Sequence, residues 1–178
     1  MRIRPCVLLV SLLALIYPAA GALAGQATRD TKPTRDIKVI SSAGARAMAD
    51  ACTAWAEQNK QVLAMAIIDW AGNLIEFHAM EGATANAIET AQLKAKSALR
   101  WRRPTSETNR IVRSGENLAA TFMNDFPQPG ALPIIVDGQV LGAMGVSSAE
   151  GEKCAQAAID AVFKKPGKIG RASCRERV

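Results

Sequence analysis

Residues 132–162, LPIIVDGQVLGAMGVSSAEGEKCAQAAIDAV, decide the fold because they encode two strands, the turn between them and a helix. The first five residues of this stretch are apolar apart from a proline and largely β-branched, which is typical of a strand. Asp137-Gly138 is a dipeptide whose members both tolerate positive φ, as a two-residue hairpin turn requires. A β-hairpin between residues 132–136 and 139–146 is therefore predicted.

Two glycines and two serines shape the end of this stretch. Gly142 and Gly145 interrupt the second strand, so either another backbone packs closely there or the strand bends. Ser147 or Ser148 can cap the helix that follows. The apolar face of that helix consists of small residues, so we expect the helix to lie close to a sheet.

The elements expected upstream alternate between hairpins and helices. In chain order, they are a helix capped by Ser41 or Ser42 and ending near Asn59, strands at 63–69 and 74–80, a helix at 85–99, a helix capped by Thr105 or Ser106, and a turn at 117–123. In the helix at 85–99, the expected buried stripe is Ile88, Ala91, Ala95 and Leu99, and Lys94 and Lys96 flank it. Hairpins separated by grouped helices predict an α+β fold rather than a doubly wound α/β sheet.

The first 38 residues are expected to lie outside the folded domain. Arg2 and Arg4, an apolar core at 7–17 and the cleavage motif Ala22-Leu23-Ala24 predict a signal peptide over residues 1–24. The apolar core is shorter than the ~20 residues that a membrane span needs, so stable membrane insertion is not expected. Residues 25–38 are polar and predict a flexible segment, and residues 39–167 have the length of one domain. Export to the periplasm, or secretion, follows.

The last residues, 168–178, are interpreted as the translation of a sequencing adapter and are left out of the fold. The leader contributes two positive charges and this tail a net three, so +1 of the formal +6 belongs to residues 25–167. A nucleic-acid partner requires a basic surface on the folded domain. We therefore do not expect one.

Three motifs resemble one known family. They are IIDWAGNLIEFHAMEGA at 67–83, KAKSALRWRRPTSE at 94–107 and PIIVDGQVLGAMGVS at 133–147. In this order they are similar to the signatures of the GlcG/HbpS haem-binding proteins, a family that also supplies the C-terminal domain of PduO-type cobalamin adenosyltransferases. The chain departs from the family pattern at Ala79, Glu81 and Ala131.

The resemblance implies a fold and a set of functions. The implied fold is a profilin-like α+β sandwich, with a mostly antiparallel sheet of about five strands, assembled as a homo-oligomer. The implied function is haem or other tetrapyrrole binding or sensing without catalysis. Two alternatives stay open: an accessory enzyme or carrier for a small organic acid or corrinoid, and a purely structural oligomeric subunit. The sequence contains no G-x-S-x-G, H-E-x-x-H or C-x-x-C motif.

His78 and Glu81 are candidate ligand-binding residues at the first hairpin. His78 is the only histidine, so it is the candidate axial ligand of a haem iron. Its alternative role is that of a strand histidine hydrogen-bonded at the surface. Glu81 follows the hairpin and could pair with Asp69 as a carboxylate dyad, although acids beside turns more often cap them.

A basic run at 94–113 is the candidate anion-binding region. Lys94, Arg102 and Arg103 are its candidate ligand-binding residues, because ammonium and guanidinium groups hold carboxylates through charge-assisted hydrogen bonds. The alternative is a solvated helix face.

Cys52 and Cys154 lie within the expected domain, on the apolar faces of its first and last helices. An oxidising compartment would permit a disulfide between them. Packed helix axes are commonly ~8 to 10 Å apart, whereas a disulfide needs Cα atoms within about 7 Å. Free buried thiols are therefore the expectation.

Overall fold

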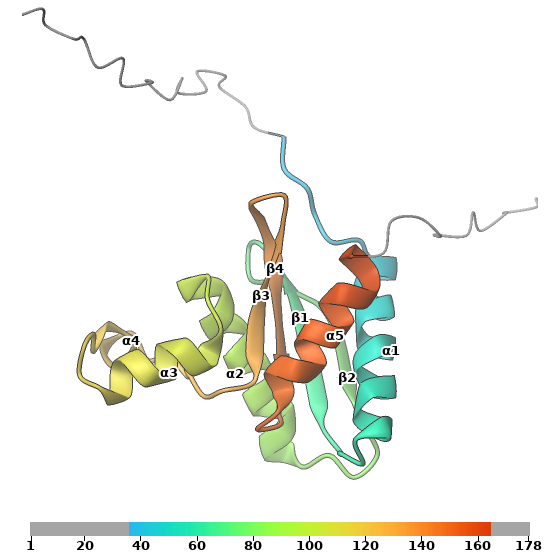
Figure 1. Ribbon diagram of the computed structural model, residues 1–178, viewed down its shortest axis with the longest axis horizontal. Helices are drawn as coiled ribbons and strands as arrows, with labels where there is room; N and C mark the ends of the chain where they lie inside the picture. Colours follow the sequence, from blue (N-terminus) through green and yellow to red (C-terminus); the bar gives the residue numbers. More distant parts are fainter. Residues whose placement is uncertain (1–35, 165–178) are drawn as a thin grey trace, which may run out of the picture. The chain divides into compact units, whose positions relative to one another are not determined.

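A computed structural model describes residues 36–164, which form an α+β domain (Figure 1). Its elements are α1 (Ser42–Gln58), β1 (Ala64–Asp69), β2 (Leu74–Ala79), α2 (Ala85–Trp101), α3 (Thr105–Arg113), α4 (Ala119–Phe122), β3 (Ala131–Val136), β4 (Gln139–Val146) and α5 (Gly151–Phe163). The predicted signal peptide and adapter-derived tail lie outside the described residues. None of the helices in this part of the chain is long and apolar enough to span a bilayer.

The sheet has the strand order β2-β1-β4-β3, and every neighbouring pair is antiparallel. This confirms the predicted α+β class and both predicted hairpins. The expected number of about five strands is wrong for residues 36–164, which contain four. Residues 139–146 form one continuous strand, because Gly142 and Gly145 do not divide it.

Gly145 allows α2 to approach the sheet closely. A Cβ at this position would lie 2.5 Å from the backbone nitrogen of Ala95 and would clash with the carbonyl oxygen of Ala91. Of the two explanations open for this glycine, close backbone packing is therefore confirmed. The small residues Ala91, Ala95 and Ala98 cover the rest of the contact.

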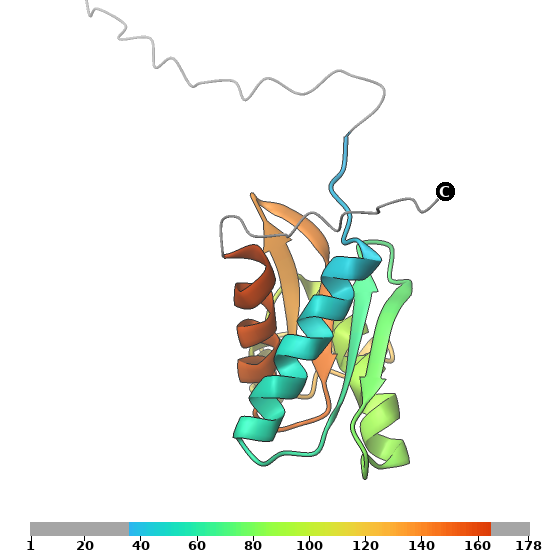
Figure 2. The ribbon, with the colours of Figure 1, turned by 90° about the vertical axis from the view of Figure 1, so that its right-hand side faces the viewer.

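The helices cover both faces of the sheet. Figures 1 and 2 show α1 and α5 side by side on one face and α2 on the other. Side chains of β1 alternate between the two layers: Met65 and Ile67 belong to the core under α1 and α5, whereas Ala66 packs towards α2. The profilin-like arrangement that the family resemblance implies stays a prediction.

A disulfide joins Cys52 of α1 to Cys154 of α5, so the expectation of free thiols is wrong. The two Cα atoms are 5.1 Å apart. The helices can approach this closely because the facing side chains are small: Ala45 and Ala49 on α1, and Ala155 and Ala158 on α5, are all buried. The spacing assumed from the sequence applies to helices with larger side chains at their contact.

Removing this disulfide should destabilise the domain. The bond closes a loop with a sequence separation of 102 residues, and losing a native disulfide typically costs about 2 to 5 kcal/mol. Urea unfolding should show this loss for Cys52→Ala/Cys154→Ala. Reductant should lower the stability of the wild type towards that of the double variant and leave the variant unchanged. Equal stabilities of the two proteins without reductant would contradict the prediction.

Candidate ligand-binding cleft beside Lys94

An open cleft of about 420 Å³ lies between α2 and two loops. Its lining residues are Asn86, Thr90 and Lys94 from α2, Phe126, Gln128 and Pro129 from the segment before β3, and Ser147, Ser148 and Ala149 from the segment between β4 and α5. The three α2 residues are spaced by four, so they lie along one face of the helix. Sites for small ligands commonly have volumes of this order.

Among the residues that the structure describes, Lys94 is the only side chain with a formal charge that lines this cleft. It is buried, with 7% of its surface exposed. Its Nζ donates a hydrogen bond to the carbonyl oxygen of Val146 at 3.3 Å. Among residues 36–164, no carboxylate lies within ion-pair distance of it. Burial lowers the pKa of Lys94, and the negative charge of Glu152 partly opposes that shift. The sequence had placed Lys94 beside the buried stripe of its helix, whereas the structure places it within the buried face.

Gly130 forms the surface against which the Lys94 amine rests. Its φ is +134°, and a Cβ there would lie 2.8 Å from Lys94 Nζ and 2.5 Å from the oxygen of Val146. A side chain at position 130 would therefore displace the amine.

Glu152 is a residue near the cleft that the sequence did not indicate. Its carboxylate accepts hydrogen bonds from the Ser106 backbone nitrogen at 2.7 Å, Ser106 Oγ at 2.8 Å and Thr105 Oγ1 at 3.3 Å. Glu152 thus accepts a hydrogen bond from a backbone N–H group at the start of α3, where Thr105 or Ser106 was expected to act as the cap. That expectation is wrong, because Pro104 occupies the N-cap position and makes no side-chain bond.

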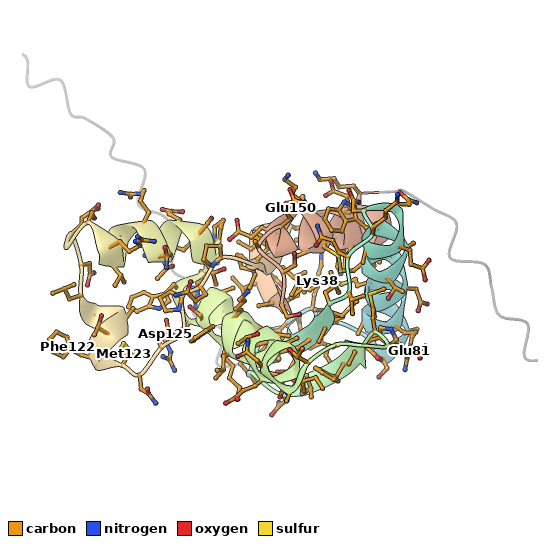
Figure 3. The ribbon with its side chains drawn as sticks, turned by 90° about the horizontal axis from the view of Figure 1, so that it is seen from below. Lys38, Glu81, Phe122, Met123, Asp125 and Glu150 are labelled. Atoms are coloured by element: carbon orange, nitrogen blue, oxygen red, sulfur yellow. A yellow bond between two sulfur atoms is a disulfide. The ribbon has the colours of Figure 1, made fainter. Side chains whose placement is uncertain are left out.

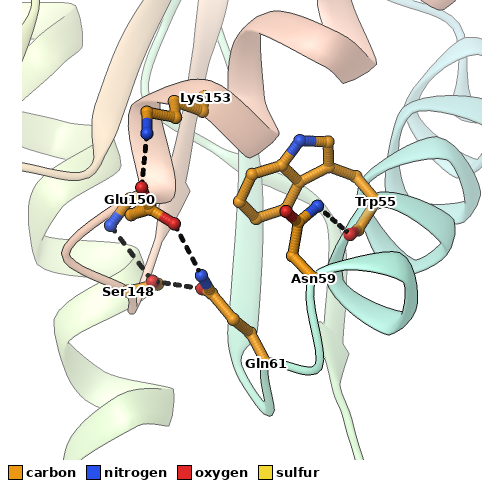
Figure 4. Close-up of polar contacts among 6 residues, drawn as sticks. All are labelled: Trp55, Asn59, Gln61, Ser148, Glu150 and Lys153. Atoms are coloured by element: carbon orange, nitrogen blue, oxygen red, sulfur yellow. Dashed lines mark hydrogen bonds and ion pairs between the residues drawn. The ribbon is translucent and has the colours of Figure 1, made fainter.

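The loop between β4 and α5 is held in place by a polar network (Figure 4). Ser148 Oγ donates to Gln61 Oε1 at 2.6 Å, and Gln61 Nε2 donates to Glu150 Oε2 at 3.0 Å. Lys153 forms a hydrogen-bonded ion pair with Glu150 and lowers the pKa of that carboxyl group. Ser147 Oγ accepts a hydrogen bond from the Ala64 backbone nitrogen at 2.8 Å, so both serines help to fix the loop. Neither caps α5, which begins after Glu150 without a side-chain cap, so that prediction is wrong.

His78 lies on the opposite face of the sheet from Lys94. It pairs with Met65 across the β1–β2 ladder, and Met65 belongs to the core under α1 and α5. The neighbouring residues Phe77 and Ala79 point instead towards α2. His78 is half-buried on an edge strand. Within one chain, a single ligand cannot contact both His78 and Lys94.

The other three candidate residues lie outside the cleft. Glu81 is exposed in the turn after β2, at the far end of the domain from Phe122 and Met123 of the α4 region (Figure 3). Arg102 is exposed at the left-handed C-cap of α2, with φ 52°. The structure thus brings none of the other four candidates into the cleft with Lys94.

Arg103 belongs to a separate, much smaller cavity of about 20 Å³. Its guanidinium lies 5.9 Å from the centroid of the Trp101 ring and 3.9 Å from Glu107 Oε1. Asp69, considered as a partner of Glu81, accepts hydrogen bonds from the backbone of Ala71 and Asn73 and serves its own turn. No group of three potential metal ligands occurs between residues 36 and 164.

The chain belongs to the family of HbpS-like haem-degrading proteins, whose model matches residues 40–162. Protein GlcG of Escherichia coli K12 is 31% identical over 109 residues, which cover 61% of this chain and 81% of GlcG. The crystal structure of Klebsiella pneumoniae protein ORFY superposes with a TM-score of 0.69 at 26% identity, over 76% of this chain and 98% of ORFY. The structure of a PduOC:heme complex has a TM-score of 0.66 at 24% identity, over 70% of this chain and 96% of PduOC, and supports the fold.

Lys94→Met should stabilise the protein at neutral pH, by about 1 kcal/mol, because it removes a buried charge that lacks an ion pair. The folded-state pKa of Lys94 is below its ordinary value of 10.5, so between these two values the unfolded chain binds more protons. The contribution of Lys94 to stability therefore rises with pH up to about 10.5. Urea unfolding at several pH values should show the advantage of the variant shrinking on the alkaline side.

Lys94→Arg is the matched control, since it keeps the charge and should bring no gain. A Lys94→Met protein less stable than the wild type at pH 7 would contradict the interpretation of Lys94 as a destabilising residue.

Proposed function

We propose that this protein is an exported haem-binding protein without catalytic activity. The observation that carries the proposal is membership of the HbpS-like family over residues 40–162. A relative of the same fold, PduOC, is described in complex with heme. Binding of haem by this chain is our inference from these relationships and from the residues around His78.

The surroundings of His78 fit part of what a haem requires, namely an axial donor, apolar contacts and cations for the propionates. His78 offers the imidazole, and Ile75 and Met80 are partly buried apolar residues on or beside the same strand. A cation near this histidine is Arg46 on α1, which forms an ion pair of 3.3 Å with Glu76. Glu76 is two residues before His78 on β2. Since β2 is an edge strand, a flat ligand could approach this histidine from outside the sheet.

Titrating hemin into the purified protein should produce a saturable Soret shift with a low-spin spectrum. His78→Ala should lose the low-spin spectrum without unfolding, because a half-buried position on an edge strand tolerates truncation. Added imidazole should restore nitrogen ligation of the iron in this variant. Absence of a Soret shift at micromolar hemin would refute haem binding, and an unchanged spectrum of His78→Ala would refute only the role of His78.

Export is proposed from the N-terminal sequence and supported by the disulfide. Disulfides persist in oxidising compartments such as the periplasm, and Cys52–Cys154 is buried between two helices. Expressed in a Gram-negative host, the protein should appear in the osmotic-shock fraction with Gly25 as its first residue. An intact Met1 on protein retained in the cytosol would contradict export.

The cleft beside Lys94 favours a second function, that of a carrier or accessory enzyme for a small organic acid. The lining of the cleft combines hydroxyl and amide side chains with a buried ammonium that has no ion pair within residues 36–164, and such a site can bind a carboxylate. This site is separate from His78, so the two functions are independent.

Homo-oligomeric assembly, including a purely structural role, stays a prediction that light scattering tests.

A further inference from the structure

The amine of Lys94 differs from the other lysines of the domain in its environment. Lysine is almost never fully buried unless it is paired. Lys94 nevertheless lies in the buried face of α2, with one hydrogen bond, of 3.3 Å, from its Nζ to Val146. Lys96, two residues along the same helix, is exposed. A buried amine that serves no ion pair within residues 36–164 is an unexplained cost to stability.

The same lysine lines a space large enough for a small molecule. Lys94 lines the cleft of about 420 Å³, together with Thr90 one turn earlier on α2 and Ser147 after β4. Gly130 lies beside the amine, since a Cβ at this position would be 2.8 Å from Lys94 Nζ. A nitrogen nucleophile is therefore held at the wall of a space of ligand size, with hydroxyl groups nearby.

Its protonation state also favours reaction. Burial lowers the pKa of Lys94, which raises the fraction of neutral amine at a given pH. Glu152 is the charged group that acts against this shift, and its carboxylate is already engaged by Thr105 and Ser106. Desolvated lysines of this kind are the ones that form Schiff bases with carbonyl substrates.

We propose that Lys94 captures small carbonyl compounds, aldehydes or 2-oxo acids, as a reversible Schiff base in this cleft. The neutral amine adds to the carbonyl carbon and gives a carbinolamine. The carbinolamine then loses the former carbonyl oxygen as water, with both hydrogens coming from the amine nitrogen, and a C=N bond remains. No oxidant or reductant takes part.

This inference deepens the organic-acid function and does not depend on haem binding. Non-covalent binding of a carboxylate by the charged ammonium would use the same cleft, but it would form no bond to nitrogen. Trapping of the Schiff base by reduction separates the two.

The full-length protein is incubated with acetaldehyde or with pyruvate in the presence of sodium cyanoborohydride, and alkylated lysines are located by peptide mass spectrometry. Lys94 should be modified faster than Lys96, because burial lowers the pKa of Lys94 and so raises its fraction of neutral amine. Lys94→Arg keeps the positive charge and should abolish the fast reaction, and Lys96→Arg should retain it. Modification by pyruvate alone would assign a 2-oxo acid, and modification by acetaldehyde alone would assign an aldehyde.

Modification of Lys94 no faster than that of Lys96 with either compound would overturn the proposal. This comparison is made within the wild-type chain, so it holds even if Lys94→Arg fails to fold. Thermal stabilisation by pyruvate without trapping would overturn Schiff-base formation and leave the organic-acid function standing. Failure to bind hemin would test neither Schiff-base formation nor the organic-acid function.

Discussion

The close contact between the backbone of α2 and that of β4 determines most of what is distinctive in this domain. It exists because Gly145 has no side chain and because Ala91 and Ala95 face it from the helix. A helix held this close to a strand brings Lys94 to the end of β4, within hydrogen-bonding distance of Val146. The cleft is thus a consequence of packing between small residues, and its charged group is buried for the same reason.

The hairpins were predictable because the residues that determine them are neighbours in the sequence. Asp137-Gly138 specifies the turn, and alternating or continuous apolar runs specify the strands on each side. The burial of Lys94 was not predictable in this way. It depends on Gly130 and Val146, which lie far from α2 in the sequence. Periodicity along α2 placed Lys94 and Lys96 alike beside the buried stripe and could not distinguish the buried lysine from the exposed one.

Residue type alone also could not predict which candidate residues lie close together in the fold. His78 and Lys94 lie in separate motifs of one family, yet the alternation of β2 directs His78 towards α1 and α5 while Lys94 lies on the other side of the sheet. The same limit explains the cysteines. The positions of Cys52 and Cys154 on two helical faces were correct, but the distance between the helices depends on the alanines around them.

The disulfide also makes most of the domain a covalent ring. Residues 52–154 include all four strands, α2 and the exposed segment around Phe122. A protease that cuts the backbone once inside this ring leaves two pieces that are still linked through sulfur, and the sheet keeps all its strands on one connected molecule. A single cut in an exposed segment of this ring therefore does not by itself separate any strand from the rest of the domain.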